Sequence, residues 1–188
     1  MSSFTSLDSG SDADWDAVRA WKLQHPRDAA APALAYLASL QNAPTEGLPI
    51  NVYRHSLQTA TRILRDGGDD ELVTVGLLHD IGDFIAERNH GEVAATILRP
   101  YINEANHWLL VHHAMFQGYH FWHQFGMDRD ARERFRGHPH FEYAAHICDQ
   151  YDQRAFDPGY DELPLRDFEP IVRRVFARTP TWGDEVVL

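Results

Sequence analysis

Apolar side chains recur every three or four residues along this chain, between breaks of glycine, proline and asparagine, and this pattern constrains the fold most. The spacing is typical of one face of a helix, whereas the alternation typical of a strand is almost absent. We therefore predict an all-α fold, a compact helical bundle. Helices are expected at residues 52–65, 70–87, 91–98, 102–113, 128–135, 140–155 and 167–177, with further helical patterns from Asp14 and across residues 33–40.

The length and the N-terminal composition predict the domain organisation. A chain of 188 residues is long enough for one domain with a substantial core and too short for two to be expected. Residues 1–12 are polar and acidic, a composition that cannot bury enough surface to become ordered. We expect a flexible tail at residues 1–12 and a single helical domain at residues 13–188.

The charge balance limits the partners of this protein. The net charge is −11 and Lys22 is the only lysine, which argues against nucleic-acid and anionic-membrane binding. The single cysteine, Cys148, excludes an internal disulfide framework and fits a reducing compartment. Because no apolar run has membrane-spanning length and the N-terminus lacks a signal-peptide pattern, we expect a cytoplasmic protein.

Residues 76–83, Gly-Leu-Leu-His-Asp-Ile-Gly-Asp, end an apolar helical stretch with His79 and Asp80. Adjacent side chains on a helix point about 100° apart, so these two share a target only if it lies beyond the helix end. One metal ion, or two neighbouring ions, would be such a target. A carboxylate in an apolar setting also needs a partner or a cation. Taken alone, the dipeptide is more often a helix-end ion pair, but other candidate ligands accompany it.

Further histidines lie at the ends of other predicted helices. The chain has twelve histidines beside its one lysine, and imidazole is the commonest protein ligand of transition metals. His55 and His90 each open a predicted helix, and His112-His113 closes another. Each of them alone is typical of a surface or structural residue. Together with His79 and Asp80 they favour a metal site, because helix ends converge in a bundle.

One distant aspartate completes this set. Phe141, Ala145, Cys148 and Asp152 follow one another at spacings of four, three and four residues. This spacing places Asp152, rather than Asp149, on the apolar face of its predicted helix. A carboxylate on that face needs a cation, although an exposed Asp152 would form only a surface ion pair.

A histidine, a later His-Asp pair and a distant aspartate on helices resemble the signature of the HD-domain superfamily, over residues 52–168. In its four-ligand form the resemblance implies one divalent ion, usually in a phosphohydrolase. The ligands that it implies are His55, His79, Asp80 and Asp152. His90 and His113 stand where dinuclear members place two additional histidines, which implies a second ion with Asp80 between the two. The choice of His113 over His112 rests on this resemblance, because the helical period does not decide it.

Two parts of the sequence are similar to the mixed-valent diiron oxygenases of the myo-inositol oxygenase and 2-amino-1-hydroxyethylphosphonate oxygenase type. The first part is residues 54–60, with their spacing to residues 76–82. The second part is residues 151–155 followed by residues 163–168, and it is similar to the phosphonate enzyme. This resemblance implies two iron ions, Fe(II) and Fe(III), that use O2 to cleave a C–C or C–P bond of a small hydroxylated substrate. A 1-hydroxy-2-aminoalkylphosphonate, free or N-methylated, would be such a substrate. The alternatives are a phosphohydrolase that uses Mn or Mg to act on a phosphate ester or nucleotide, and a sensor that retains only the pocket.

The expected substrate contacts depart from that type. Both families carry a basic or imidazole group where this chain has Asp83, and the phosphonate enzyme has lysines at the positions of Gln117 and Phe156. Arg154 or Arg54 could bind a phosphonate instead, unless both are solvated surface residues. The aromatic run at residues 116–125 is either core or a pocket wall that binds an amine by cation-π attraction. The substrate-binding candidates are Asp83, Gln117, Tyr119, Trp122 and Arg154.

Overall fold

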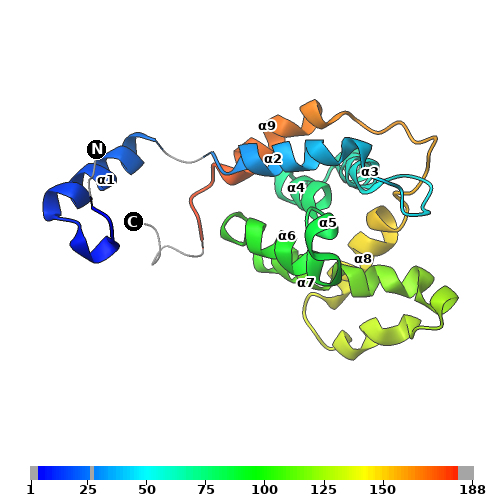
Figure 1. Ribbon diagram of the computed structural model, residues 1–188. Coiled ribbons are helices and arrows are strands. Elements are labelled where there is room, and N and C mark those ends of the chain that lie inside the picture. Colours follow the sequence, from blue (N-terminus) through cyan, green and yellow to red (C-terminus); the bar gives the residue numbers. More distant parts are fainter. Residues whose placement is uncertain (1–3, 26–27, 182–188) are drawn as a thin grey trace.

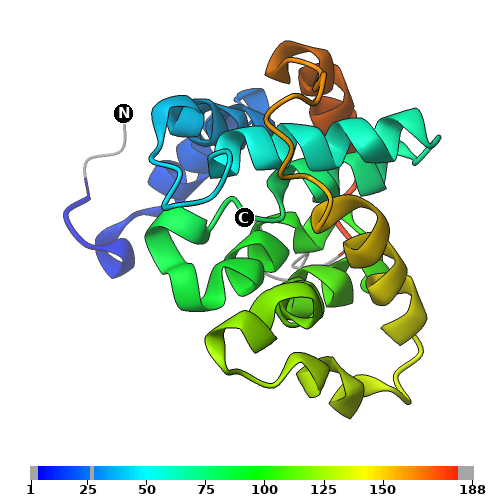
Figure 2. The ribbon, with the colours of Figure 1, turned by 90° about the vertical axis from the view of Figure 1, so that its right-hand side faces the viewer.

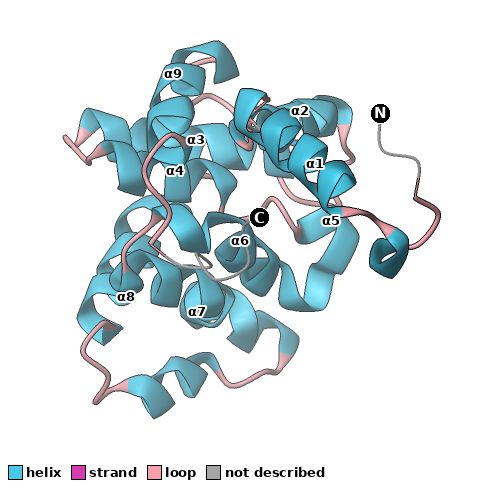
Figure 3. Ribbon diagram, turned by 90° about the vertical axis from the view of Figure 1, so that its left-hand side faces the viewer, coloured by secondary structure: helices cyan, strands magenta, loops and turns pink. Residues whose placement is uncertain are grey.

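The computed structural model describes residues 4–25 and 28–181, and every regular element in these ranges is a helix (Figures 1 and 3). The prediction of an all-α fold is therefore confirmed. The α-helices are α1 (Asp12–Gln24), α2 (Ala30–Ser39), α3 (Val52–Arg65), α4 (Asp70–Leu78), α5 (Asp83–Ala86), α6 (His90–Leu98), α7 (Glu104–Phe121), α8 (Phe141–Ile147) and α9 (Leu165–Phe176). Short 3-10 helices lie at Leu7–Ser9, Leu40–Asn42, Glu87–Asn89, Arg99–Tyr101, Trp122–Phe125 and Arg129–Phe135, and a π-helix lies at Cys148–Asp152.

Three of the helices that build the site begin at a side-chain cap. Asn51 accepts a hydrogen bond from the backbone N–H of Arg54 at the start of α3, at 3.1 Å. Asp69 caps α4 and Asn103 caps α7 in the same way. A cap of this kind contributes about 1 kcal/mol because it satisfies an N–H that has no partner inside the helix.

Helix α4 lies at the centre of the bundle, against α3, α7 and α9 (Figure 1). Its sequence is apolar on almost every side, and Val73, Val75, Leu77 and Leu78 are buried. A helix that is apolar all round is stable only inside a core, and each such side chain contributes about 1.5–3 kcal/mol on burial. The buried position of α4 brings the residues that follow Leu78 into the interior.

Figure 2 shows the π-helix, in yellow, beside α3, in cyan, and these two elements are in contact. The sequence predicts one regular helix over residues 140–155, but α8 ends at Ile147 and the chain continues as a π-helix. Segments of this kind are rare and often occur at functional sites.

The predicted helix at residues 70–87 is also interrupted. Helix α4 ends at Leu78, and residues 79–82 form turns before the short helix α5. The backbone of Gly82 lies so close to α6 that a Cβ atom there would be 2.8 Å from the carbonyl oxygen of His90. The turn and this close approach direct His79 and Asp80 toward the neighbouring helices.

Two other boundaries differ from the prediction. The sequence predicts that the helix of His113 ends there, but α7 continues through Phe121 and therefore includes residues 116–121 of the aromatic run. The predicted helix at residues 128–135 is a 3-10 helix. The bounds of α3 agree with the prediction.

Helix α1 stands apart from the other helices in Figure 1 and has no buried residue. Of the predicted tail, residues 1–3 lie outside the described ranges, while Leu7–Ser9 forms a 3-10 turn. The division into a tail and one domain remains a prediction. No helix in the described ranges is long and apolar enough to cross a membrane.

Candidate metal centre

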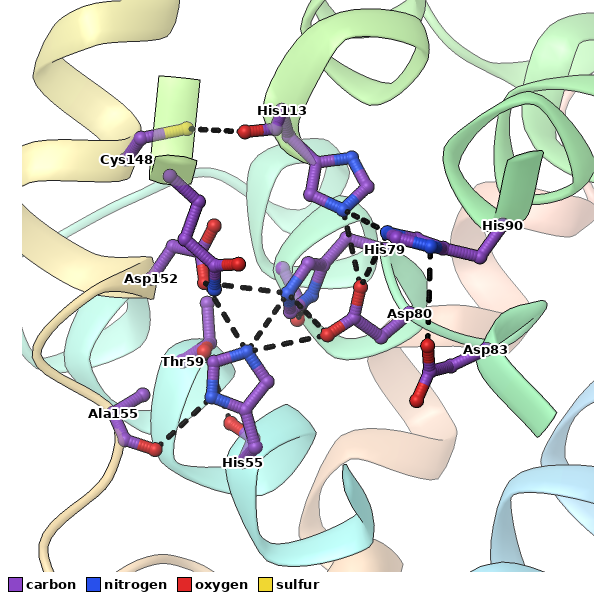
Figure 4. A network of polar contacts seen from close by, with 12 residues as sticks. His55, Thr59, His79, Asp80, Asp83, His90, His113, Cys148, Asp152 and Ala155 are labelled. Carbon is purple, nitrogen blue, oxygen red and sulfur yellow. Dashed lines mark hydrogen bonds and ion pairs between the residues drawn. The ribbon is translucent and has the colours of Figure 1, made fainter. Parts of the chain in front are cut away.

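The six side chains expected to bind metal come from separate parts of the chain and meet in the interior of the bundle (Figure 4). His55, His79, His113 and Asp152 are buried, and Asp80 and His90 are partly buried. His55 lies in the first turn of α3, and His79 and Asp80 lie in the turn after α4. His90 begins α6, His113 lies in the middle of α7, and Asp152 ends the π-helix.

Each of the four histidines has its Nδ1 atom beside a backbone carbonyl oxygen. A carbonyl only accepts hydrogen bonds, so Nδ1 carries the proton and Nε2 of the neutral ring presents a lone pair. Metal-binding histidines usually have this arrangement, because the Nδ1–H bond fixes the orientation of the ring. The distances are 3.0 Å from His55 to Ala155, 2.9 Å from His79 to Gly76, 2.8 Å from His90 to Glu87 and 2.7 Å from His113 to Leu110.

The first donor group contains His55, His79, Asp152 and one oxygen of Asp80. The Nε2 atoms of His55 and His79 are 3.0 Å apart. Oδ1 of Asp152 lies 3.1 Å from Nε2 of His55 and 3.5 Å from Nε2 of His79. Oδ2 of Asp80 lies 3.4 Å and 3.2 Å from the same two nitrogens. Both carboxylates thus approach the same pair of imidazole nitrogens.

The second donor group uses the other oxygen of Asp80. Oδ1 of Asp80 lies 3.1 Å from Nε2 of His113 and 3.4 Å from Nε2 of His90. The two Nε2 atoms are 3.1 Å apart. Because each carboxylate oxygen of Asp80 belongs to a different group, Asp80 stands between two adjacent donor sets.

The donor separations fit metal coordination. For metal–ligand distances of about 2.1 Å, neighbouring donors are about 3.0 Å apart in an octahedron and about 3.4 Å apart in a tetrahedron. The separations in both groups, 3.0–3.5 Å, lie in this range. Oδ2 of Asp152 is buried and has no hydrogen-bond partner among the described residues, and a buried carboxylate is costly unless a cation compensates its charge. The residues present therefore fit a metal centre.

The carboxylates of the centre favour positive charge. Burial alone would lower the pKa of His55, but hydrogen bonds to Asp152 and Asp80 outweigh burial and raise this pKa to about 9. The same carboxylates raise the pKa of His79 against the effect of burial. Burial raises the pKa of Asp80 and Asp152, but the imidazoles hold both pKa values below the ordinary range. A metal cation would satisfy the same preference for positive charge.

His112 and His113 differ in their surroundings. His113 faces Asp80 and His90, whereas His112 lies against the rings of Trp108 and Phe135, with ring centroids 4.5 Å away in each case. Burial lowers the pKa of His112. His113 is thus the neighbour that reaches the donor groups.

A cavity of about 320 Å³ reaches the centre, since His55, Asp80 and His90 form part of its wall. Two of the substrate-binding candidates, Asp83 and Gln117, also line it. The remaining lining residues are Pro44, Thr45, Glu46, Leu48, Ile50, Asn51, Val52, Phe84, Glu87, Phe121 and Phe156. The described part of this wall contains no lysine or arginine.

The other substrate-binding candidates lie elsewhere. The ring of Tyr119 packs beneath the guanidinium group of Arg132, 3.7 Å from the ring centroid. Trp122 covers Gly118, where a Cβ atom would lie 2.3 Å from the indole. Arg154 is exposed and does not line the cavity. Tyr119, Trp122 and Arg154 thus do not line this cavity, and their role as substrate contacts remains a prediction.

Arg54, the alternative phosphonate-binding arginine, is held by a carboxylate. Its guanidinium group donates to both oxygens of Glu162, at 2.5 Å and 3.0 Å, and to the carbonyl of Pro158 at 3.2 Å. It does not line the cavity. The positive charge of Arg54 is compensated within the fold.

Gln58 supports the centre, although the sequence did not mark it as a site residue. It is buried, and its amide donates to the carbonyl of Asp157 at 2.7 Å and accepts from the N–H of Asp157 at 3.2 Å. These bonds hold the segment in which Ala155 accepts from His55 and Phe156 stacks on the His55 ring, at 4.4 Å between centroids. The available signal was a polar residue three positions after His55 on a buried helix face.

Residues 52–154, more than half of the chain, match the family model described as HD domain. The chain therefore belongs to the HD domain family. Membership implies a metal-dependent enzyme, typically a phosphohydrolase. No curated protein matches the chain.

Proposed function

We propose that this protein is a dinuclear non-haem iron oxygenase that uses O2 to cleave a C–C or C–P bond of a small hydroxylated substrate. The observation that carries this proposal is the sharing of Asp80 between two donor groups, with one carboxylate oxygen in each. A single ion would need only the first group. The position of His90 and His113 around the other oxygen supports a second ion beside the first.

The chemistry of the donors supports iron. Four of the six side chains are imidazoles and two are carboxylates. Imidazole suits iron and other transition metals, whereas magnesium prefers oxygen ligands and retains several waters. Two iron ions, Fe(II) and Fe(III), would be held by His55, His79, Asp80, His90, His113 and Asp152.

The cavity supports a small substrate with little negative charge beyond the group that the metals bind. Besides the metal ligand Asp80, three carboxylates line it, those of Glu46, Asp83 and Glu87, and they would repel a nucleotide. An ammonium group would be attracted by these carboxylates and by the rings of Phe84 and Phe121. A 1-hydroxy-2-aminoalkylphosphonate, free or N-methylated, fits this arrangement if the metals neutralise its phosphonate.

When bound, the iron pair would supply the activation of O2 and the oxidation of the carbon that bears the substrate hydroxyl. The protein would keep the histidine rings in place through their Nδ1–H bonds. Phe156, stacked on His55 at the cavity wall, would limit the access of water from that side.

A metal-dependent phosphohydrolase is the second candidate, and membership of the HD domain family favours it. One experiment separates the two. Protein is loaded with iron under low oxygen, its electron paramagnetic resonance spectrum is recorded with and without a hydroxyalkylphosphonate, and O2 uptake is measured. A coupled Fe(II)/Fe(III) signal that the substrate perturbs, with O2 uptake, supports the oxygenase. Phosphate release from a phosphate ester with Mn or Mg, and no O2 uptake with iron, would refute it.

A further inference from the structure

Gln117 lies between the cavity and the first donor group. Its side-chain amide donates to Oδ1 of Asp152 at 2.7 Å, a short distance for an N–H donor and typical of a bond to a charged acceptor. The same oxygen is the one that faces Nε2 of His55 and His79. Gln117 thus contacts the donor atom of Asp152 itself.

The two oxygens of Asp152 have different surroundings. Oδ1 has the Gln117 bond and the two imidazole nitrogens, whereas Oδ2 is buried without a hydrogen-bond partner. The bond from Gln117 therefore distinguishes the two oxygens and fixes the rotation of the carboxylate. The χ2 torsion that rotates an aspartate carboxylate has only a weak preference of its own, so a side-chain contact is needed to set this orientation.

Gln117 also lies four residues after His113 on α7, and side chains at this spacing share one face of a helix. His113 belongs to the second donor group, while Gln117 contacts the first. One face of α7 therefore sets the positions of donors in both groups.

We propose that Gln117 is a positioning residue that fixes the plane of the Asp152 carboxylate, so that the one oxygen to which Gln117 donates is directed at the first metal ion. This inference rests on the proposed metal centre but not on the identity of the reaction. Gln117 also lines the cavity, so its expected role as a substrate contact remains a prediction. Partners of metal ligands that act in this way typically change metal affinity about 10–100-fold when they are removed.

The test is a Co²⁺ titration of the full-length protein, followed by visible absorption and by competition with a chelator. Gln117→Leu removes the donor at similar volume, and Gln117→Asn retains the amide but shortens its reach by one methylene. We expect both variants to bind the first Co²⁺ about 10–100-fold more weakly, with an altered absorption spectrum. Circular dichroism reports whether each variant is folded, and Gln117→Met is the substitute if Gln117→Leu is not.

Gln153→Leu is the matched control. Gln153 follows Asp152 directly, but its amide donates to the carbonyl of Asp149 at 2.9 Å and not to a donor atom of the centre. This variant should keep the affinity and the spectrum of the wild type. Unchanged Co²⁺ binding in folded Gln117→Leu would overturn the inference while leaving the metal centre intact, and so would equal losses in Gln153→Leu. A wild type that binds no Co²⁺ would overturn the metal centre as well.

Discussion

The Nε2 atoms of His55 and His79 face each other at 3.0 Å, although both rings already direct their Nδ1–H groups to backbone carbonyls. With both Nδ1 atoms protonated, the two Nε2 atoms oppose lone pairs when the rings are neutral, and they bring like charges together when both rings bind a further proton. A metal cation between them removes the repulsion.

Removal of metal should destabilise the wild-type protein. Ligand binding to the folded state adds about 2.7 kcal/mol when the free metal is at about 100 times its Kd, so addition of a chelator should lower the melting temperature by several degrees. The measurement is a thermal scan with and without the chelator, and with iron restored. His79→Ala serves as the control, since a chelator should not shift its melting temperature. A shift of equal size in this variant would contradict the prediction.

Single ligand substitutions should reveal the two donor groups. Asp80 belongs to both groups, so Asp80→Ala should lose most bound metal. His90 touches only the second group, and His90→Ala should retain about one ion per chain instead of about two. Elemental analysis of purified variants gives the ratio. His112→Ala is the control for His113→Ala, because His112 faces Trp108. Metal loss from the His112 variant and not from the His113 variant would refute the assignment of His113 to the second donor group.

Gly91→Ala should damage the second donor group through packing alone. A Cβ atom at residue 91 would lie 2.4 Å from the carbonyl oxygen of Leu110 and 3.0 Å from Cε1 of His113, so α6 and α7 would have to separate. We expect destabilisation of about 1–3 kcal/mol in urea unfolding, with weaker binding of the second ion. Gly137→Ala is the control, since no atom lies within 4 Å of its Cβ position. Equal behaviour of the two variants would show that the close approach does not matter.

Glu71 should contribute stability that depends on pH. Burial raises the pKa of Glu71, but the N–H of Asn103, the amide of Asn106 and the guanidinium of Arg178 outweigh burial and lower it. A carboxylate with a lowered pKa stabilises the fold above its unfolded pKa of about 4.3, and this contribution is lost as the pH falls through the folded pKa.

The test for Glu71 compares the wild type with Glu71→Gln across pH. Near pH 7 the variant should be less stable by about 1–3 kcal/mol, and the difference should decrease below about pH 4.3. Urea unfolding at several pH values measures it. Glu92→Gln, on the exposed surface of α6, should show little difference at any pH. A Glu71 difference that grows as the pH falls would have the wrong sign.

Several features of this protein could be predicted from the sequence because they depend on local spacing and residue chemistry. The bounds of α3 follow from its apolar period. The preference for Asp152 over Asp149 follows from the same kind of spacing: Asp152 is buried, whereas Asp149 is only partly buried and pairs with His120 and Arg132. The candidate metal ligands could be chosen because histidine and aspartate at apolar helix ends require a partner.

Other features were decided only by the tertiary structure. The division of Asp80 between two donor groups, the contact from Gln117 to Asp152 and the pairing of Arg54 with Glu162 join residues that are far apart in the sequence. The sequence specifies each side chain but not its rotation about the helix axis relative to a neighbouring helix. That rotation is set by how the apolar faces of the helices pack, because burial fixes the faces first and the polar side chains then meet whichever partners the packed helices bring to them.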